Sequence, residues 1–392
     1  MSKLEQLLQE LCPDGVEYLT IKDIAKDIYR GTGIKRDQVT AKGIPCVRYG
    51  EIYTTYGIWF EQCVSHTFLE YIKSPKYFEH GDILFAITGE KVEDIAKSTV
   101  YVGYEKCLAG GDIVVVKHNQ NPKYISYALS TSDARKQKSA GKVKSKVVHS
   151  SVSAIEVLRI PLPPLEVQRE IVRILDNFTE LTAELTAELT AELTARKKQY
   201  EYYRDLLLAF DANTRFERLG NTCYMKSGKA VSSVKISVEP SEHTPYKCFG
   251  GNGVRGFVAD ASHYGEFPII GRQGALCGNV NYATGNFYAT EHAVVVESKG
   301  AYLQRFLYYL LISMNLNQYK SQGAQPGLAV GNLENLIAPV PSLDVQKSIV
   351  SILDRFDALC NDLTIGLPAE IEARQKQYEY YRDKLLAFEE AG

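Results

Sequence analysis

The sequence lacks long uncharged hydrophobic runs, and it has no pattern that indicates secretion or zinc binding. No stretch reaches about 18 uncharged apolar residues, the length that spans a bilayer, and Met1–Glu10 has no apolar core of a secretory signal. The 8 cysteines include no Cys-x-x-Cys pair, so neither a disulfide framework nor a zinc site is expected. We therefore expect a cytoplasmic protein with reduced thiols and no membrane association.

Motifs for catalysis are missing as well. Residues 251–256 match the spacing Gly-x-Gly-x-x-Gly, but residues 257–258 after them read as a strand, where a dinucleotide site needs a helix. Residues 227–230 lack the upstream glycine and the Ser/Thr of a phosphate loop. No His-Glu-x-x-His or Gly-x-Ser-x-Gly motif occurs. These absences favour a binding subunit over an enzyme, with no catalytic residue, cofactor or metal of its own.

The length and charge of the chain allow two domains and only a local nucleic-acid footprint. The 392 residues are 45% hydrophobic and 23% charged, which is ordinary for folded proteins. A net charge of −2 excludes a uniformly basic nucleic-acid binder. Segments 1–158 and 211–337 each carry +2, whereas 159–210 and 338–392 carry −2 and −4. Any contact with DNA must therefore be local, and the first and third segments are the mildly basic parts of the chain.

The chain contains an internal repeat. Residues 161–210 align with 339–388 at a constant offset of 178 and without a gap. Roughly 30 of about 50 aligned positions are identical, far above chance. Two copies are too few for a solenoid, so the repeat predicts a duplicated, pseudo-twofold molecule.

Both copies have the periodicity of long amphipathic helices. In the first copy the apolar positions run from Ile171 through Leu181, Leu185 and Leu193 to Phe210, at spacings of three and four. A helix of about 45 residues is roughly 65–70 Å long and needs a partner for its apolar stripe. The second copy is the natural partner, so we expect an antiparallel coiled coil if the connecting segment doubles back.

One feature distinguishes the two copies. The first contains Thr-Ala-Glu-Leu three times over residues 182–193, and each unit adds about 6 Å of helix. The second copy has Gly366 and Pro368 at the matching place. Because proline removes a helical hydrogen bond, we expect a kink or break near 366–368.

The remaining segments read as two related globular heads with short strands. Strand-like runs lie at 44–49, 82–88 and 112–117 in the first head, and at 246–249, 267–271 and 293–297 in the second. Each head then has a helical stretch, which starts at Tyr124 or Tyr302. We predict an α+β fold with two similar globular domains joined by two long helices. The predicted domains are residues 1–158, 159–210, 211–336 and 337–392.

The order of head, Pro-x-Pro-x-Leu-x-x-Gln helix, second head and second such helix is recognisable. Residues 161–176 and 339–354, the Gln-Tyr-Glu-Tyr-Tyr-Arg-Asp runs at 199–205 and 377–383, and the Thr-Ala-Glu-Leu units are its most specific parts. With them, essentially the whole chain resembles the specificity subunit of type I restriction-modification systems.

The resemblance implies a DNA-binding protein with two target recognition domains. Each head would read one half of a bipartite sequence in double-stranded DNA, and the helices would set the spacer and dock two modification (methyltransferase) subunits. Those subunits would bind S-adenosylmethionine, and restriction subunits would use ATP and Mg²⁺. None of this catalysis would belong to the chain itself.

Candidate DNA contacts follow from side-chain chemistry. Arginine pairs with guanine and Asn or Gln with adenine, while lysines contact phosphates. Such residues lie beside glycines, turns or the lysine-rich stretch 135–146, which we read as a loop that is equally well a solvated surface. The candidates are Arg48, Tyr49, Thr88, Lys91, Lys142, Lys144, Lys146, Asn252, Arg255, Arg272, Gln273, Gln322 and Gln325.

Two other function classes remain as alternatives. A nucleotide-dependent enzyme built on residues 251–256 would bind its cofactor as an isolated chain. A duplicated scaffold for protein or glycan ligands would show no salt-dependent DNA binding, even with modification subunits present.

Overall fold

The structure, a computed structural model, describes residues 1–142, 147–321, 326–361 and 366–391. Its contacts divide the chain into two compact units. Unit 1 comprises Met1–Ala187 and Glu372–Gly392, and unit 2 comprises Glu188–Ile371. Each predicted head therefore forms one compact body with a part of both repeat helices.

Unit 1 contains two sheets and two short ladders. The five-stranded sheet has the order β2-β11-β7-β9-β4, and the four-stranded sheet has the order β5-β3-β10-β6. Neighbours are antiparallel except for the parallel pairs β4/β9 and β3/β10, and the ladders are β1/β13 and β8/β12. The strands are β1 (Tyr18–Thr20), β2 (Ala25–Arg30), β3 (Ile44–Val47), β4 (Trp59–Phe60), β5 (Ser65–Thr67), β6 (Tyr77–Phe78), β7 (Ile83–Ala86), β8 (Thr88–Gly89), β9 (Ser98–Tyr101), β10 (Cys107–Ala109), β11 (Ile113–His118), β12 (Val148–His149) and β13 (Arg159–Pro161).

Strand β7 and the first four residues of β11 are apolar because both of their faces are buried. Phe85 and Val114 enter the core that also contains residues of α4 and α7. Leu84 and Val115 point to the opposite face and enter a second, more aromatic core. Successive residues of a strand alternate between faces, so these short runs supply both cores.

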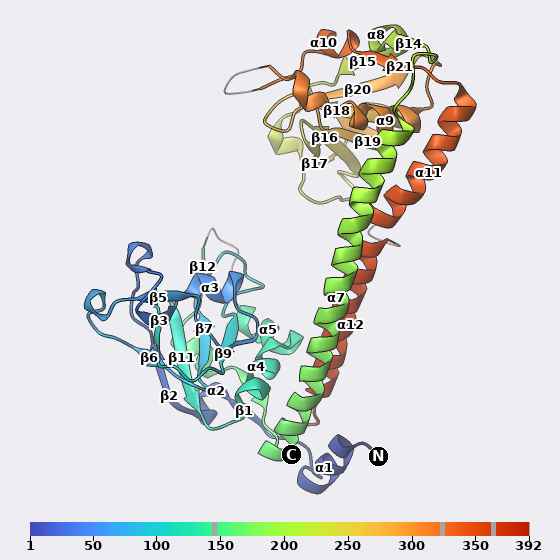
Figure 1. Cartoon of the computed structure of the whole chain (residues 1–392). Coiled ribbons are helices and arrows are strands. Elements are labelled where there is room, and N and C mark those ends of the chain that lie inside the picture. Colours follow the sequence, from blue (N-terminus) through green and yellow to red (C-terminus); the bar gives the residue numbers. More distant parts are fainter. Residues whose placement is uncertain (143–146, 322–325, 362–365, 392) are drawn as a thin grey trace. The chain divides into compact units, whose positions relative to one another are not determined.

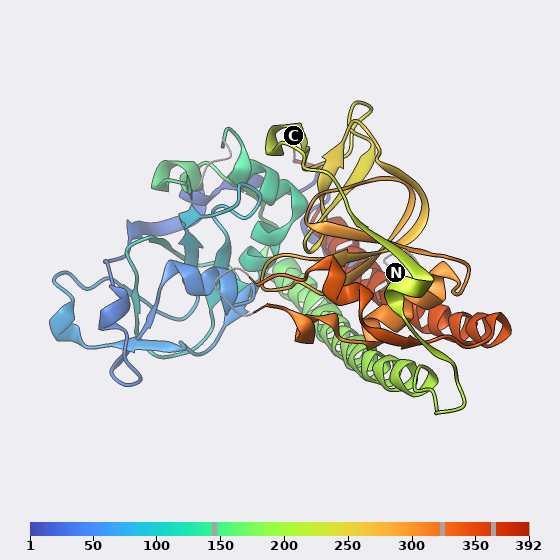
Figure 2. The same cartoon turned by 90° about the horizontal axis from the view of Figure 1, so that it is seen from above.

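Helices α4 and α5 cover one side of the strands of unit 1, and Ile52 of α3 packs on the opposite face. The teal helices α4 and α5 lie between those strands and the first part of the green helix α7 (Figures 1 and 2). The elements are α1 (Lys3–Leu11), α2 (Ile21–Ile24), α3 (Tyr49–Thr54), α4 (Pro122–Ser130), α5 (Ser132–Ser139), α6 (Val152–Glu156), the first part of α7 (Leu165–Leu207), most of α12 (Leu367–Leu385), and the 3₁₀ turns η1 (Arg36–Gln38) and η2 (Leu69–Tyr71).

Unit 2 has one larger sheet with the order β15-β20-β18-β19-β16-β17, and a ladder of β14 with β21. Helix α9 packs against β18 and against α11 (Figure 1). The strands are β14 (Phe216–Arg218), β15 (Cys223–Ser227), β16 (Tyr246–Gly250), β17 (Gly253–Val258), β18 (His263–Gly271), β19 (Val280–Ala289), β20 (Ala293–Ser298) and β21 (Ile337–Pro339). The helices are α8 (Leu219–Thr222), α9 (Gln304–Ser313), α10 (Val330–Glu334) and α11 (Leu343–Asn361), with turns η3 (Ser233–Lys235) and η4 (Leu316–Tyr319).

The elements predicted from the sequence are present. Each of the six predicted strand segments overlaps an observed strand, and α4 and α9 correspond to the predicted helical stretches. The α+β class is confirmed. Within the described ranges, no helix combines the length and the apolar character that a membrane crossing requires.

The two repeat copies differ where the sequence predicts a break. The first copy is one continuous helix, α7, of 43 residues. In the second copy α11 ends at Asn361 and α12 begins at Leu367. Pro368 then lies in the first turn of α12, where the missing amide proton removes no helical hydrogen bond. The predicted break is confirmed.

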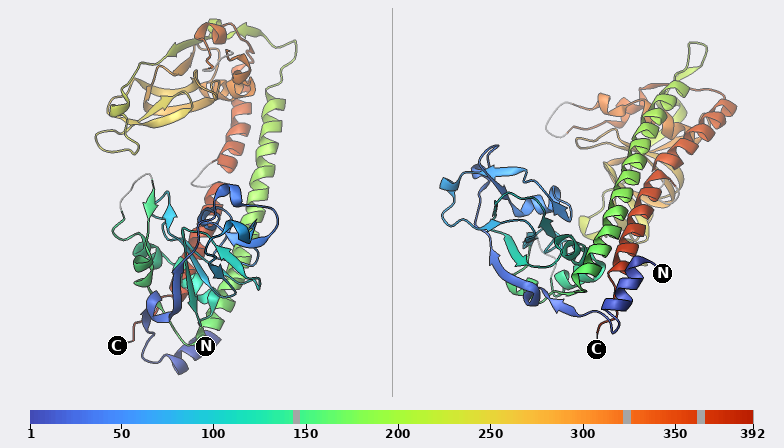
Figure 3. Two further views of the ribbon diagram at one scale, coloured as in Figure 1. Left: turned by 90° about the vertical axis from the view of Figure 1, so that its left-hand side faces the viewer. Right: turned by 60° about the horizontal axis from the view of Figure 1, so that its bottom comes forward.

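The two copies pack against each other in an antiparallel sense in both units. In unit 1 the rings of Phe178 and Tyr381 stack with centroids 6.2 Å apart. In unit 2 the aligned pair, Phe356 and Tyr203, stacks at 5.7 Å. Residue numbers rise along α7 as they fall along its partner, and Figure 3 shows α7 beside α11 and α12. The predicted antiparallel pairing is confirmed.

The predicted continuous stripe on α7 is wrong in its middle part. The side chains of Leu181 and Leu185 are 63% and 36% exposed, while Leu189 and Leu193 are half-buried. Four residues turn an α-helix by about 400°, so each tetrapeptide unit displaces its leucine by about 40° around the axis. Leucines at a strict spacing of four therefore cannot stay on one face.

The glutamine of the Pro-x-Pro-x-Leu-x-x-Gln motif has the same role in both units. Gln168 and Gln346 are completely buried. The Oε1 atom of Gln168 accepts a hydrogen bond from the Asn121 backbone N–H (3.0 Å), and that of Gln346 accepts one from the Leu303 N–H (2.8 Å). Each Nε2 donates to a proline carbonyl before its own helix, at 2.7 and 2.9 Å. The glutamines thus join α7 to the start of α4, and α11 to the start of α9.

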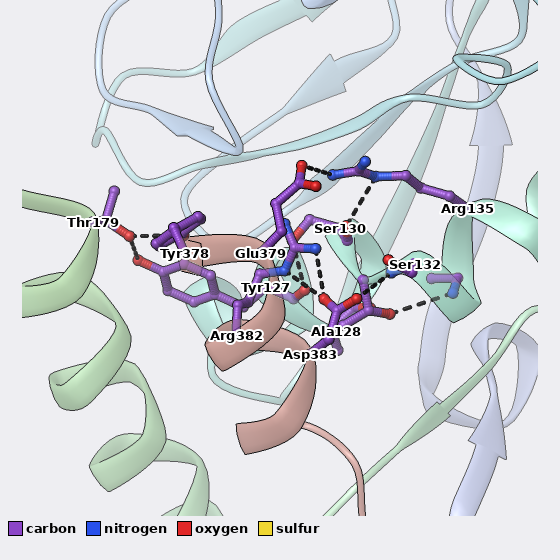
Figure 4. A network of polar contacts seen from close by, with 12 residues as sticks. Tyr127, Ala128, Ser130, Ser132, Arg135, Thr179, Tyr378, Glu379, Arg382 and Asp383 are labelled. Atoms are coloured by element: carbon purple, nitrogen blue, oxygen red, sulfur yellow. Dashed lines mark hydrogen bonds and ion pairs between the residues drawn. The ribbon is translucent and has the colours of Figure 1, made fainter. Parts of the chain in front are cut away.

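An aspartate on the repeat helix holds the neighbouring head helix in unit 1. Asp176 accepts hydrogen bonds from Lys123 Nζ and the Tyr127 hydroxyl, both at 2.8 Å. The Tyr127 hydroxyl also lies 3.0 Å from Thr179 Oγ1, which lies 2.9 Å from the Tyr378 hydroxyl of α12. Figure 4 shows the contacts of Tyr127, Thr179 and Tyr378, which come from three different helices. Burial raises the pKa of Tyr127, so its hydroxyl stays protonated.

Unit 2 repeats the arrangement with an arginine in the place of the lysine. Asp354, which aligns with Asp176, accepts hydrogen bonds from Arg305 Nε (2.7 Å) and the Tyr309 hydroxyl (2.5 Å). The Nη2 atom of Arg305 lies 2.8 Å from Asp357 Oδ2. Each head is therefore held to its helix by a carboxylate, a cation and a tyrosine.

In unit 1 the last turns of α12 also contact α5. Arg135 forms an ion pair with Glu379 at 3.1 Å, and the Ser132 backbone N–H donates to Asp383 at 3.0 Å (Figure 4). Arg382 is buried and pairs with Asp383 at 2.5 Å. These contacts fix the first turn of α5 against the distal repeat helix.

Candidate nucleic-acid interface

A basic cavity lies in unit 1 where β2 and β3 end and β11 begins. Its volume is about 890 Å³, and its lining includes Arg30, Arg36, Arg48, Tyr49 and Asp112. We call these five residues the unit 1 junction. The cavity contains two of the predicted DNA contacts, Arg48 and Tyr49. Their position follows from the sequence, since both come directly after strand β3.

Arg48 is held in place by a buried carboxylate. Its Nε and Nη2 atoms both lie 3.2 Å from Glu51 Oε1, and its backbone N–H donates to Glu51 Oε2 at 3.0 Å. The Ser65 hydroxyl donates to Glu51 Oε1 at 2.6 Å. Glu51 is buried, whereas the Arg48 side chain is partly exposed. The guanidinium therefore has a fixed orientation and keeps N–H groups for a further ligand.

The other two arginines of the unit 1 junction differ in their pairing. Arg30 pairs with Asp112 at 2.5 Å. Among the described residues, the side chain of Arg36 has no hydrogen-bond or ion-pair partner. The junction thus combines cations with an accessible carboxylate.

Two glycines leave the wall of this cavity flat. A Cβ atom added to Gly33 or Gly50 would meet nothing within 4 Å, and neither residue has a positive φ. By contrast, a Cβ at Gly31 would lie 2.2 Å from the Gly110 carbonyl oxygen, so packing alone requires that glycine. Neither backbone conformation nor packing explains Gly33 and Gly50, and glycine also permits close approach to a ligand.

Unit 2 has the same backbone frame at the corresponding place. In unit 1 Gly31 N–H donates to Ile113 O (2.8 Å) and Ile87 N–H donates to Asp112 O (3.0 Å). Unit 2 repeats both hydrogen bonds, from Gly228 to Ala293 (3.0 Å) and from Arg272 to His292 (2.9 Å). The strand registers agree, because Arg30 pairs with Val114 as Ser227 pairs with Val294.

The side chains on this frame differ between the units. Ser227 takes the place of Arg30, His292 the place of Asp112, and Arg272 the place of Ile87. We call Ser227, Arg272, Gln273, Glu291 and His292 the unit 2 junction.

The unit 2 junction contains buried polar atoms without partners. Arg272 Nη1 donates to Ser227 Oγ at 2.8 Å, and His292 Nε2 lies 3.2 Å from Glu291 Oε1. Within the described part of the chain, Arg272 Nε, Glu291 Oε2 and His292 Nδ1 are buried and make no hydrogen bond. Leaving a buried polar group unpaired costs about 1–3 kcal/mol, so these atoms are suited to a ligand.

The other predicted contacts in unit 2 lie near Gly251, which contacts the unit 2 junction. A Cβ at Gly251 would lie 2.8 Å from the Gln273 carbonyl oxygen and 3.7 Å from His292. Asn252 accepts a hydrogen bond from Asn279 at 3.0 Å, and Arg255 is exposed on β17. The structure therefore brings Asn252, Arg272 and Gln273 together. Gln322 and Gln325 lie outside the described residues.

The remaining predicted contacts of unit 1 lie away from its junction cavity. The Thr88 hydroxyl is 3.3 Å from His149 Nδ1, and Lys91 is exposed. Lys142 is half-buried after α5. Lys144 and Lys146 lie outside the described residues.

The expectation of a loop across 135–146 is wrong for its first part. Residues 135–139 belong to α5, and Arg135 is engaged by Glu379. Lys138 is buried, and its Nζ donates to Leu129 O (2.8 Å) and Ser98 Oγ (3.0 Å). Burial lowers the pKa of Lys138 to about 7. A buried, paired lysine serves the structure of unit 1 and is not available to a phosphate.

Sequence reasoning missed Arg30, Arg36, Asp112, Ser227 and His292. Arg36 lies in the turn η1, and the other four come from strand ends that are far apart in the sequence. The paired glycines Gly31 and Gly228 carried the only available signal, because each follows the edge strand of its head. Among the residues that the structure describes, no three His, Cys, Asp or Glu side chains are grouped to hold a metal ion.

Comparison with known proteins identifies the family. A family model described as the type I restriction modification DNA specificity domain matches residues 13–195 and 252–373. The match covers well over half of the chain, so the chain belongs to this family of non-catalytic DNA specificity subunits.

Individual relatives support the assignment. The specificity subunit of the EcoprrI type I restriction enzyme of Escherichia coli is 53% identical over 207 residues, 52% of each chain. The chain thus spans about half the length of that relative. A type I specificity subunit of Mycoplasma pneumoniae is 33% identical over 238 residues, 58% of this chain and 94% of that one. A specificity subunit of Haemophilus influenzae is 36% identical over 276 residues, 64% and 68% of the two chains.

Solved structures share the fold. A chain from a structure described in terms of complex assembly and conformational transition of the type I R-M system superimposes with a TM-score of 0.70, over 96% of this chain and 98% of that one, at 17% identity. The HsdS subunit of Thermoanaerobacter tengcongensis gives a TM-score of 0.52 over 96% of both chains at 16% identity. At such low identity the likeness concerns the fold alone.

Proposed function

We propose that each unit reads one half of a bipartite sequence in double-stranded DNA, and that the paired helices fix the spacing between the halves. The observation that supports this proposal most strongly is that the two units share one backbone frame but carry different side chains at its strand ends. A subunit that reads a non-palindromic target needs two different reading surfaces, and one duplicated frame can carry both.

The distribution of charge supports this proposal. The segments that contain the two junctions carry +2 each, while the segments that contain the repeat helices carry −2 and −4. The local arginines supply attraction to DNA, and the acidic helices do not compete for it. The overall charge therefore directs the duplex toward the heads.

We further propose that the paired helices dock two modification subunits. Each unit contains one equivalent end of the helix pair, with an exposed tyrosine at the aligned positions Tyr202 (65%) and Tyr380 (61%). Two equivalent surfaces suit two copies of one partner. Methyl transfer with S-adenosylmethionine, and cleavage with ATP and Mg²⁺ by restriction subunits, would take place on those partners.

The test is methylation profiling of DNA from cells that express the chain with its modification subunit. We expect one methylated motif with two specified halves and an unspecified spacer. The control is the modification subunit expressed alone, which should leave no such motif. A continuous motif, or methylation that does not depend on this chain, would contradict the proposal.

A further inference from the structure

We infer that the unit 1 and unit 2 junctions read base edges, with Arg48 contacting a guanine in one half-site and Arg272 a guanine in the other. The inference rests on the proposed function and assigns the reading to particular residues. Three features of the junctions carry it: fixed guanidinium groups, unpaired buried atoms, and flat glycine walls.

The fixed orientation of Arg48 favours base reading over phosphate contact. Glu51 is buried and engages the Arg48 guanidinium with one oxygen and the Arg48 backbone with the other. A phosphate attracts any nearby cation, and it does not require a guanidinium held at a set angle. The O6 and N7 atoms of guanine do require such a fork, since they accept two parallel hydrogen bonds.

Carboxylates at both junctions lead to the same conclusion. Asp112 lines the unit 1 cavity, and Glu291 lies beside His292 in unit 2. A carboxylate repels a phosphate, whereas it accepts a hydrogen bond from the amino group of cytosine. A cation next to a carboxylate therefore complements a guanine–cytosine base pair better than it complements the DNA backbone.

In unit 2 the unpaired atoms point to a missing polar partner. Arg272 is fixed through Nη1 by Ser227, yet its Nε has no partner within the described ranges. The Nδ1 atom of His292, at the place of Asp112, is also unpaired there. Base edges present closely spaced donors and acceptors, which can satisfy several such atoms at once.

In unit 1 the open glycines provide room for the ligand. Gly33 and Gly50 are not required by backbone conformation or by packing in the free protein. A ligand that approaches the backbone of the cavity explains their lack of side chains. This feature supplies a test that does not disturb the fold.

The experiment compares methylated motifs and DNA affinity of the assembled methyltransferase for Arg48→Lys, Arg272→Lys and the unaltered chain. Lysine keeps the charge but loses the fork. We expect Arg48→Lys to relax a guanine in one half of the motif, with about a tenfold or greater loss of preference, and Arg272→Lys to relax one in the other half. Retention of the motif by both variants would overturn the inference while leaving the proposed function intact.

Gly50→Ala serves as the second variant, because nothing in the unit 1 cavity clashes with the added methyl group. We expect an unchanged melting temperature, and weaker methylation at the half-site that Arg48→Lys alters. Gly331→Ala is the matched control, since its Cβ also meets nothing within 4 Å and it lies on α10. Equal methylation by both glycine variants would count against the unit 1 assignment, whereas absence of any bipartite motif with the unaltered chain would overturn the proposed function instead.

Discussion

Units 1 and 2 agree where they contact the repeat helices and differ where their strands end. Gln168 and Gln346, and Asp176 and Asp354, make the same contacts to head helices. At the junctions, Arg30 corresponds to Ser227 on the same backbone frame. The duplication has therefore kept the contacts that position each head and has varied the surface that each head presents.

The sheets differ for a reason that is visible in the backbone. In unit 2, β18 and β19 are long strands that pair over eight registered positions. In unit 1 the same frame is split, so that β6 and β7 together correspond to β18, and β9 and β10 to β19. Gly81, with a positive φ of 91°, lies in the interruption between β6 and β7. One continuous sheet in unit 2 thus corresponds to two sheets in unit 1.

The largest expected effect concerns the Thr-Ala-Glu-Leu units of residues 182–193, which only the first repeat copy possesses. On the proposed function, removing one Thr-Ala-Glu-Leu unit shortens α7 by about 6 Å, against about 3.4 Å per base pair of DNA. We expect the spacer to change by one or two base pairs while both half-sequences stay the same. Methylation profiling of repeat-number variants measures this, and an altered half-sequence would contradict it.

The glutamine contacts should be equally important in both units. Gln168→Ala removes the partner of two backbone groups and Gln346→Ala that of three, and each change should destabilise the affected unit by about 3 kcal/mol. Trp59, the single tryptophan, reports unfolding of unit 1, and calorimetry reports both units. Only Gln168→Ala should shift the tryptophan transition; a shift with Gln346→Ala would show that the units unfold together.

A pH dependence should distinguish unit 1 through Lys138. Its pKa is lowered to about 7 by burial, while in the unfolded chain it is about 10.4. Between these values the unfolded chain holds a proton that the folded chain lacks, so stability rises with pH. From pH 7 to 9 we expect about 2 kcal/mol more gain in the unaltered chain than in Lys138→Met, measured by denaturant unfolding at each pH. Equal slopes would contradict the burial argument.

The smallest effect on stability should come from replacing Asp176 or Asp354, the aspartates that hold the head helices. Tyr309 donates only to Asp354 among the described residues, whereas Tyr127 also contacts Thr179. We expect Asp354→Ala to destabilise unit 2 by about 2 kcal/mol and Asp176→Ala to destabilise unit 1 by about 1 kcal/mol. Calorimetry of the two variants checks the order, and a larger loss for Asp176→Ala would contradict it.

Much of the fold could be predicted from local patterns. The gapless repeat, the helix periods and Pro368 fixed the helices and their break, and apolar runs located the central strands. The prediction of a continuous leucine stripe on α7 was wrong because residues spaced four apart shift gradually around the helix axis. The junctions were only half predictable: all four of Arg48, Arg272, Asp112 and His292 stand beside strand ends, but which of these strand ends meet depends on pairing between strands that are distant in the sequence.

The buried glutamine of unit 2 has a practical consequence for engineering. Its three hydrogen bonds go to backbone atoms alone, namely Leu303 N, Ala301 O and Pro341 O. Every amino-acid sequence supplies such atoms, so this anchor does not depend on which side chains the attached body carries. A foreign reading module with a helix at the place of α9 could therefore use this glutamine unchanged, provided that it also supplies partners for Asp354, as Arg305 and Tyr309 do.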